Sequence, residues 1–68
     1  MSLTCRIGEN IRRLRERRQM TQQRLATEAD VSLSLVNWIE VGKRDNVTIK
    51  TLEKLAKVLD TTVEALIK

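Results

Sequence analysis

The 68-residue sequence contains no proline, only two glycines and no long polar run. Because glycine and proline mark turns and linkers, their scarcity indicates an all-helical chain with short connections and without linkers, repeats or low-complexity segments. The length allows one domain, over residues 1–68, and limits the surface that folding can bury. Such a domain needs well-packed helices, a partner, or both.

The sequence also lacks histidine and has a single cysteine, Cys5. An internal disulfide and a Cys/His zinc site are therefore excluded, and we expect no metal and no cofactor. Without a histidine base, a glycine-rich phosphate loop or a carboxylate cluster, catalysis is poorly supported, and we expect no enzyme. No apolar run reaches the length of a signal peptide or a membrane span, so we expect a cytoplasmic protein with no membrane partner.

Positive charge is concentrated in the first third of the chain. Residues 1–24 hold seven arginines and two glutamates, a net charge of +5, whereas residues 25–68 hold six basic and seven acidic side chains, a net charge of −1. A basic pole suits a polyanion such as DNA. The same pattern is typical of a solvated helix face, and composition alone does not separate the two.

Residues 21–44 carry the most informative pattern, which predicts two short helices joined by a tight turn and followed by a basic loop. Thr21 and Ser32 stand at N-cap positions, where a side-chain oxygen accepts from a free backbone amide. Asp30 lies between the helices, where the chain must take a left-handed conformation that aspartate tolerates. Gly42 is placed to end the second helix. The expected inward residues are Leu25, Ala26 and Ala29, then Val31 at the corner, then Val36 and Ile39.

Three more helices are expected around this pair. One covers residues 4–18, one begins after Thr48, and one covers residues 63–68, while the pair itself covers residues 22–29 and 33–41. Asp60 is expected to turn the chain as Asp30 does, and Thr62 to cap the last helix. The further inward residues are Ile7, Ile11, Leu14, Leu52, Leu55, Ala56, Leu59 and Leu66.

Five short motifs, in this order and at these spacings, resemble the small helix-turn-helix proteins of the phage-repressor and Cro type, the Xre-like family. They are Ile11-x-x-Leu14-Arg15, Met20-Thr21-Gln22-x-x-Leu25-Ala26, Val31-Ser32, Val36-x-x-Ile39-Glu40-x-Gly42-Lys43-Arg44 and Leu52-x-x-Leu55-Ala56-x-x-Leu59. The resemblance covers roughly residues 6–67. It implies an all-α, five-helix bundle of the phage-repressor DNA-binding type with a central helix-turn-helix. It also implies a small bacterial or phage transcriptional regulator that binds specific double-stranded DNA, with the recognition helix, about residues 33–41, in the major groove.

The loop after the recognition helix departs from the family pattern, which usually has a proline there. It reads Gly42-Lys43-Arg44-Asp45-Asn46-Val47-Thr48, with one extra residue. The run from Asn46 to Leu52 is similar to the controller proteins of restriction-modification systems, and we take this as a hint at a subfamily.

The resemblance implies two roles that support the recognition helix. Arg15 and Glu40 match a partly buried ion pair that fixes the recognition helix against the first helix, and a guanidinium suits bidentate contact with a carboxylate. The alternative is two solvated charges. Gln22, in the first turn of its helix, matches a residue that contacts the DNA backbone and braces a recognition-helix side chain.

Leu33, Ser34 and Trp38 match base-reading positions, and two of these three are apolar. Apolar side chains contact thymine methyl groups, and serine or asparagine reaches base edges, so we expect modest affinity per half-site and an A·T bias. Lys43 and Arg44 are expected to pair with flanking phosphates. The expected DNA contacts are Gln22, Gln23, Ser32, Leu33, Ser34, Asn37, Trp38, Lys43 and Arg44.

Trp38 leaves a second function open. It lies about 100° around the helix from Ile39, and a small rotation would turn it partly inward. If exposed, Leu33, Leu35, Trp38 and Val41 form an apolar surface of the kind that binds proteins. This favours a protein-interaction module, such as an antitoxin-like or anti-regulator protein, that uses this surface or the last helix. The chain fits either a complete protein or a domain of a longer regulator.

A homodimer is expected, because one small domain reads few bases and the family binds two-fold symmetric sites. The half-sites would lie about 34 Å apart, one helical turn. We expect the dimer contact at the last helix and the turn before it, through Thr61, Val63 and Ile67. Val63 and Ile67 are spaced i, i+4 and exceed the needs of the core.

Overall fold

The computed structural model describes the backbone of residues 3–43 and 47–68, and side chains within these ranges from residue 6 onward. Five helices follow one another: α1 (Leu3–Arg17), α2 (Gln22–Ala29), α3 (Leu33–Glu40), α4 (Ile49–Val58) and α5 (Val63–Ile67). The expected all-α, five-helix architecture is confirmed. The predicted bounds agree with the observed ones to within one residue; α3, for example, ends at Glu40, with Val41 as its cap. None of the described helices has the length and apolar character needed to span a membrane.

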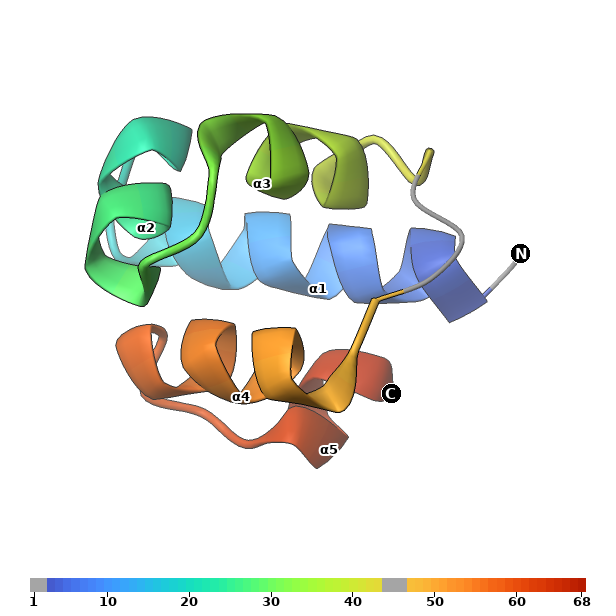
Figure 1. Cartoon of the computed structure of the whole chain (residues 1–68). Helices are drawn as coiled ribbons and strands as arrows, with labels where there is room; N and C mark the ends of the chain where they lie inside the picture. The colour runs from blue at the N-terminus through green and yellow to red at the C-terminus, as the bar shows by residue number, and fades with distance from the viewer. Residues whose placement is uncertain (1–2, 44–46) are drawn as a thin grey trace.

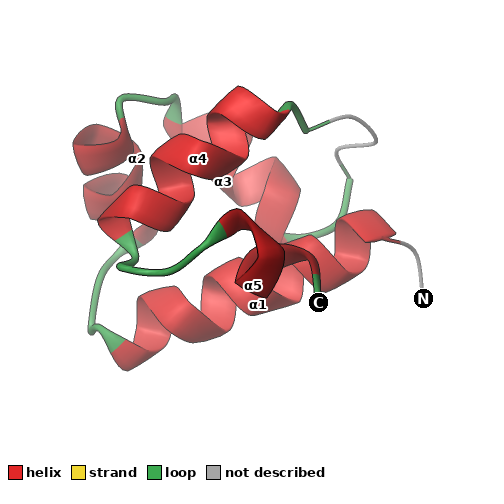
Figure 2. Cartoon of the chain, turned by 90° about the horizontal axis from the view of Figure 1, so that it is seen from below, coloured by secondary structure: helices red, strands yellow, loops and turns green. Residues whose placement is uncertain are grey.

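The helices close into a ring around one core. In Figure 1, α3 lies along one side of α1, while α4 and α5 lie on the opposite side. The main contacts join α1 to α3, α3 to α2, α2 to α4, α4 to α5, and α5 back to α1. Figure 2 shows α5 between α4 and α1, where it completes the ring. Each helix therefore has two neighbours against which it buries its apolar stripe.

Each of the five helices contributes one aliphatic side chain with no exposed surface. These side chains are Ile11, Leu25, Ile39, Leu55 and Leu66. Burying each one contributes about 1.5–3 kcal/mol. The other buried hydrophobic residues are Ile7, Met20, Ala26, Ala29, Val36, Leu52, Ala56 and Leu59. The predicted inward residues are confirmed, with Leu14 and Val31 partly buried against the core. Met20, expected only as part of a connection, is buried as well.

Side-chain caps begin four of the helices. The hydroxyl oxygens of Thr21, Ser32, Thr48 and Thr62 each accept from the backbone amide three residues later, at 3.0, 3.0, 3.2 and 3.1 Å. Each cap satisfies an amide that has no partner inside its helix and contributes about 1 kcal/mol. The predicted caps are confirmed.

The ends of α1 to α4 share one backbone geometry. A left-handed residue follows each helix, and the next amide reaches back to the carbonyl five residues earlier, as in Met20 to Arg15 at 3.1 Å. The left-handed residues are Gln19, Asp30, Gly42 and Asp60, with φ of 56°, 57°, 75° and 55°. Only one of the four is glycine, although this conformation costs other residues about 1–2 kcal/mol. The predicted turns at Asp30, Gly42 and Asp60 are confirmed, and the one at Gln19 was not foreseen.

Two residues of α1 hold its neighbours at short range. A Cβ built on Gly8 would overlap the carbonyl oxygen of Ile39, so only glycine lets α1 and α3 approach this closely. Among the described residues, Asn10 is the one polar residue that is buried, with 7% of its surface exposed. Its Nδ2 donates to the carbonyl oxygen of Leu66 at 2.7 Å. This bond satisfies a terminal carbonyl of α5, which has too few residues to satisfy it internally.

We expect Gly8→Ala to destabilise the fold by about 1–3 kcal/mol, because the added methyl group must push the α3 backbone away from α1. Helix propensity alone predicts the opposite sign, since alanine favours a helix over glycine by about 1 kcal/mol. Urea unfolding followed by circular dichroism measures the difference. Arg13→Ala, which places alanine at an exposed position of the same helix, is the control. Equal or greater stability of Gly8→Ala would contradict the close approach.

Candidate nucleic-acid interface

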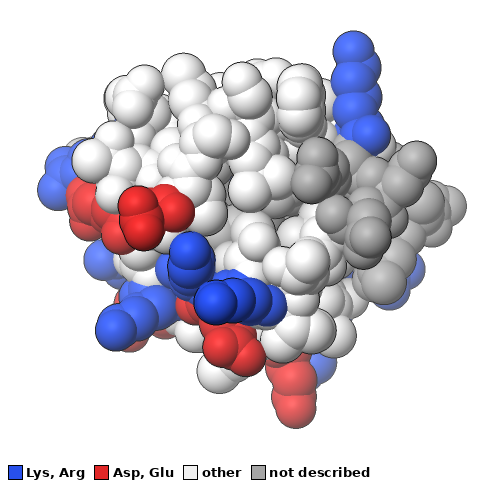
Figure 3. All heavy atoms as spheres, viewed as in Figure 1, with Lys and Arg blue, Asp and Glu red and all other residues white. Residues whose placement is uncertain are grey.

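The outer surface of α3 is exposed and uncharged. Val36 and Ile39 point into the core, while Leu33 is 42% exposed and Trp38 is 47% exposed. Ser34 and Asn37 are exposed between them. Figure 3 shows this region of the molecule, over α3, almost free of charged side chains, while charges gather lower on the same face. The outer surface of α3 therefore offers apolar groups, one hydroxyl and one amide.

The expected apolar patch is smaller than predicted. Leu35 is partly buried and packs against the core, so it does not join Leu33, Trp38 and Val41 at the surface. Position 35 lies 100° from Val36 on the helix, on the side that faces the core. The exposure of Trp38 agrees with its place among the expected DNA contacts, and a contact between Trp38 and DNA stays a prediction.

A partly buried ion pair joins α1 to α3. The Arg15 Nε donates to Glu40 Oε2 at 2.8 Å and Nη2 donates to Oε1 at 3.0 Å, which gives a bidentate contact. The side chains are 12% and 3% exposed, so the alternative of two solvated charges is wrong. The third nitrogen, Nη1, donates to the carbonyl oxygen of Met20 at 2.7 Å. One guanidinium thus holds the end of α1, the α1–α2 connection and the last turn of α3.

The Arg15 guanidinium stays charged in this setting. Its hydrogen bond to Glu40 raises the pKa of Arg15, burial lowers it, and the charges of Glu40 and Glu16 raise it further. The net effect is a pKa above the ordinary value. Because this pKa is raised, deprotonation of Arg15 itself would remove its stabilising contribution only as the pH rises through that value. The guanidinium therefore does not switch the site across the ordinary pH range.

Gln22 continues this network toward the surface. Its Nε2 donates to Glu40 Oε1 at 3.0 Å, and its Oε1 accepts from Asn37 Nδ2 at 3.4 Å. The structure thus brings Gln22 against the recognition helix, as a bracing role requires. The link to Asn37 could not be read from the sequence, because it depends on how α2 and α3 are rotated against each other.

The remaining predicted contacts surround this surface. Gln23 is exposed, and its Nε2 donates to Thr27 within α2 at 3.2 Å. Ser32 is exposed, with its hydroxyl accepting at the start of α3, and Lys43 is exposed just beyond the end of α3. Arg44 lies outside the described residues.

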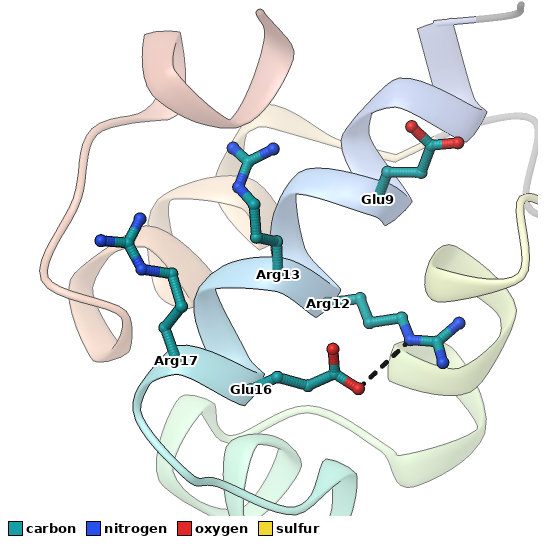
Figure 4. A pocket seen from close by; sticks show the side chains of 5 residues that line it. All are labelled: Glu9, Arg12, Arg13, Glu16 and Arg17. Atoms are coloured by element: carbon teal, nitrogen blue, oxygen red, sulfur yellow. Dashed lines mark hydrogen bonds and ion pairs between the residues drawn. The ribbon is translucent and has the colours of Figure 1, made fainter.

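Five arginines lie on α1, whereas α3 has no basic residue. A hollow of about 410 Å³ lies on α1. In Figure 4, Arg13 and Arg17 extend to one side of the helix and Arg12 extends to the other. Arg12 pairs with Glu16 at 3.4 Å, both exposed. The basic N-terminal segment is thus partly a solvated helix face, which was the alternative that composition left open.

The predicted dimer residues differ in exposure. Ile67 is 37% exposed, whereas Thr61 and Val63 are only partly exposed and Val63 packs against the core. Val63 therefore contributes to the core, and Ile67 is the apolar side chain that α5 leaves at the surface.

Residues 6–67 match the family described as "Helix-turn-helix domain". The chain belongs to this helix-turn-helix family. It is 42% identical over 59 residues to the HTH-type transcriptional repressor RghR of Bacillus subtilis (strain 168), a match that covers 87% of this chain and 44% of RghR. It is 37% identical to the uncharacterized HTH-type transcriptional regulator RghRB of the same organism, of which 42% is covered. The chain thus spans less than half the length of these relatives.

Two solved helix-turn-helix structures have the same fold. SinR, the master regulator for biofilm formation, solved in complex with DNA, has a TM-score of 0.88 and 34% sequence identity, and the match covers 91% of this chain and 98% of the chain in that structure. The restriction-modification controller protein C.AhdI of Aeromonas hydrophila has a TM-score of 0.87 and 32% identity, with 93% and 94% covered. The resemblance to Xre-like proteins is confirmed, and the controller proteins are among the similar structures.

We expect Arg15→Met to destabilise the domain by about 3–5 kcal/mol, because it leaves the buried Glu40 carboxylate without its cation. Adding Glu40→Leu to this variant recovers part of the loss, since the double variant buries no unpaired charge. Chemical unfolding of the two variants measures both effects. Arg12→Met is the control, because it breaks an exposed pair worth less than about 1 kcal/mol. A loss for Arg15→Met no larger than that of the control would contradict the importance of the pair.

Proposed function

We propose that this chain binds specific sequences in double-stranded DNA as a bacterial or phage transcriptional regulator, with α3 in the major groove. The observation that carries the proposal is the exposed, uncharged outer surface of α3, held in place by the Arg15–Glu40 pair. A helix of this width fits the major groove of B-DNA. The likeness to a repressor, RghR, and to SinR, which was solved in complex with DNA, supports the same function.

The parts of the proposed interface divide into base contacts and phosphate contacts. Leu33, Ser34, Asn37 and Trp38 would face the bases, where apolar groups suit thymine methyl groups. The first turn of α2, at Gln22 and Gln23, and the loop after α3 would face phosphates, because helix N-termini and cations favour anions. Such an interface reads bases through neutral groups and gains most of its electrostatic attraction at its edges.

The decisive experiment first selects, from a randomised pool, the duplexes that the protein binds. The protein is then titrated with the most enriched duplex and, separately, with a scrambled duplex, while Trp38 fluorescence is followed at two salt concentrations. We expect an enriched two-fold symmetric site, an emission change with that site, and a much weaker response to the scrambled duplex. In the same titrations Lys43→Ala weakens binding to both duplexes alike, and it lowers the slope of log affinity against log salt concentration by about one unit. Lys57→Ala, which removes an exposed cation from α4, is the control. Equal, weak and salt-abolished responses to both duplexes would overturn the proposed function.

We also propose that the chain acts as a homodimer whose contact includes α5. Ile67 is the exposed apolar side chain of this helix, and it offers an apolar contact that a second copy could cover. Two copies would double the number of bases read and place two α3 helices about 34 Å apart.

We expect Ile67→Glu to shift the protein from dimer to monomer in sedimentation experiments and to weaken binding to the symmetric site, while the fold is kept. A charge at a contact between identical surfaces meets its own copy across the two-fold axis, which costs association energy. Ile49→Glu is the matched control, because Ile49 is 61% exposed on α4. If the Ile67→Glu variant remains a dimer and the Ile49→Glu variant becomes a monomer, the dimer contact lies away from α5.

The exposed apolar side chains of α3 favour one alternative function, a module that binds a protein rather than DNA. Leu33, Trp38 and Val41 are each 42% exposed or more. The chain also has a TM-score of 0.88 and 34% identity to a chain of the SinR/SinI protein complex, with 91% of this chain and 60% of that chain covered. The selection experiment separates the alternatives, because a protein-binding module would enrich no duplex sequence.

A further inference from the structure

A directed chain of hydrogen bonds leads from the buried ion pair to the surface of α3. A guanidinium can only donate and a carboxylate can only accept, so Gln22 must turn its NH2 group toward Glu40. This is the arrangement observed, with Gln22 Nε2 at 3.0 Å from Glu40 Oε1. The oxygen of Gln22 therefore faces away from Glu40, and it accepts from Asn37 Nδ2 at 3.4 Å. The charge of Glu40 thus determines the orientation of two amide groups in succession.

The last amide in this chain is left with one donor and one acceptor. Asn37 Nδ2 carries two hydrogens, of which Gln22 takes one. Within the described part of the chain, no hydrogen bond is made to Asn37 Oδ1, and the residue is exposed on the outer surface of α3. One N–H and the carbonyl oxygen of this exposed amide are therefore left for a partner outside the domain.

This pair of groups matches one base edge in the major groove. Adenine offers N7 as an acceptor next to the N6 amino group as a donor, and an asparagine amide binds both at once. Guanine offers two acceptors, so its O6 would face the Asn37 oxygen, and cytosine and thymine offer only one polar group each. Because the Gln22 oxygen accepts from Asn37 Nδ2, Gln22 favours one orientation of the amide and so one order of donor and acceptor along the groove. The braced amide thus distinguishes A·T from T·A as well as from both G·C orientations.

We infer that Asn37 reads one adenine in each half-site through its Nδ2 and Oδ1, and that Gln22 is a positioning residue that orients this amide. The inference rests on the proposed DNA-binding function and adds the base and the atoms that recognise it. Asn37 donates to adenine N7 and accepts from the adenine amino group. Leu33 lies one helical turn before Asn37 on the same outer surface and suits a neighbouring thymine methyl group.

The test compares base preference, position by position, in the site selected by the wild-type protein. At one position the wild type favours adenine over the other bases by about 5- to 100-fold. Asn37→Ala removes this preference and keeps the preferences at the other positions. Replacing that adenine by 7-deazaadenine, or by purine without the amino group, weakens wild-type binding and leaves binding of Asn37→Ala unchanged.

Gln22→Leu tests the positioning role, with Thr27→Val, at an exposed position of the same helix outside the proposed interface, as its control. Gln22→Leu reduces discrimination at the adenine position and lowers the A·T over T·A preference there, whereas Thr27→Val leaves both unchanged. A loss of affinity that is equal for all sequences would instead show that Gln22 contacts only phosphate, and would overturn the positioning role. Thermal unfolding of each variant confirms that the fold is kept.

The outcomes separate this inference from the function on which it rests. A wild-type protein that selects no sequence would defeat the proposed function itself. A wild-type protein that selects a clear site, in which Asn37→Ala changes no position or changes all positions equally, would overturn the adenine contact and leave the proposed function standing. A preference lost at a guanine or thymine position would likewise overturn it.

Discussion

The arrangement of this domain depends on the bidentate pair between Arg15 and Glu40. Both side chains are largely withdrawn from water, which costs several kcal/mol per ion before any attraction is gained. The cost is offset because each polar atom of the pair has a partner, including the Met20 carbonyl and the Gln22 amide. A geometry this demanding is satisfied in one relative placement of α1, α2 and α3. The pair therefore specifies the rotation of the recognition helix more than it stabilises the fold.

The rest of the fold allows such a placement because no helix is independent. Helices of five to fifteen residues are marginal in isolation, so each one relies on its two neighbours in the ring. Gly8 sets the distance between α1 and α3, and Asn10 anchors α5 to α1. Loss of either contact opens the ring at α1, the helix that also carries Arg15. The site and the scaffold thus depend on the same helix.

Most of the fold follows from local signals in the sequence, and the parts that do not are contacts between helices. A cap such as Thr21 lies directly before its helix, and buried residues such as Val36 and Ile39 recur at helical spacing. Both kinds of signal can therefore be read from the sequence. Gln19 was missed because glutamine has no marked preference for the left-handed conformation, which the packing of Met20 imposes on it. Leu35 was misplaced because a few tens of degrees of helix rotation decide whether a residue at the boundary is covered. At the site, Arg15 and Glu40 came from the family resemblance, and the hydrogen bond between Gln22 and Asn37 required the structure.

The uncharged surface of α3 implies a division between affinity and specificity. Contacts with phosphates supply salt-dependent attraction that is the same for every sequence, while base edges supply the differences between sequences. A recognition helix with arginines would mix the two, because each arginine also attracts any nearby phosphate. Here the only charged residue of α3 is Glu40, which Arg15 neutralises within the protein, so the groups proposed to face the bases are neutral. Neutral amides and methyl groups gain little from non-specific DNA, and a wrong base leaves a polar group unpaired. We therefore expect such a surface to have low affinity as a single copy and high discrimination when two copies act together, which is the physical reason to propose that this domain works as a pair.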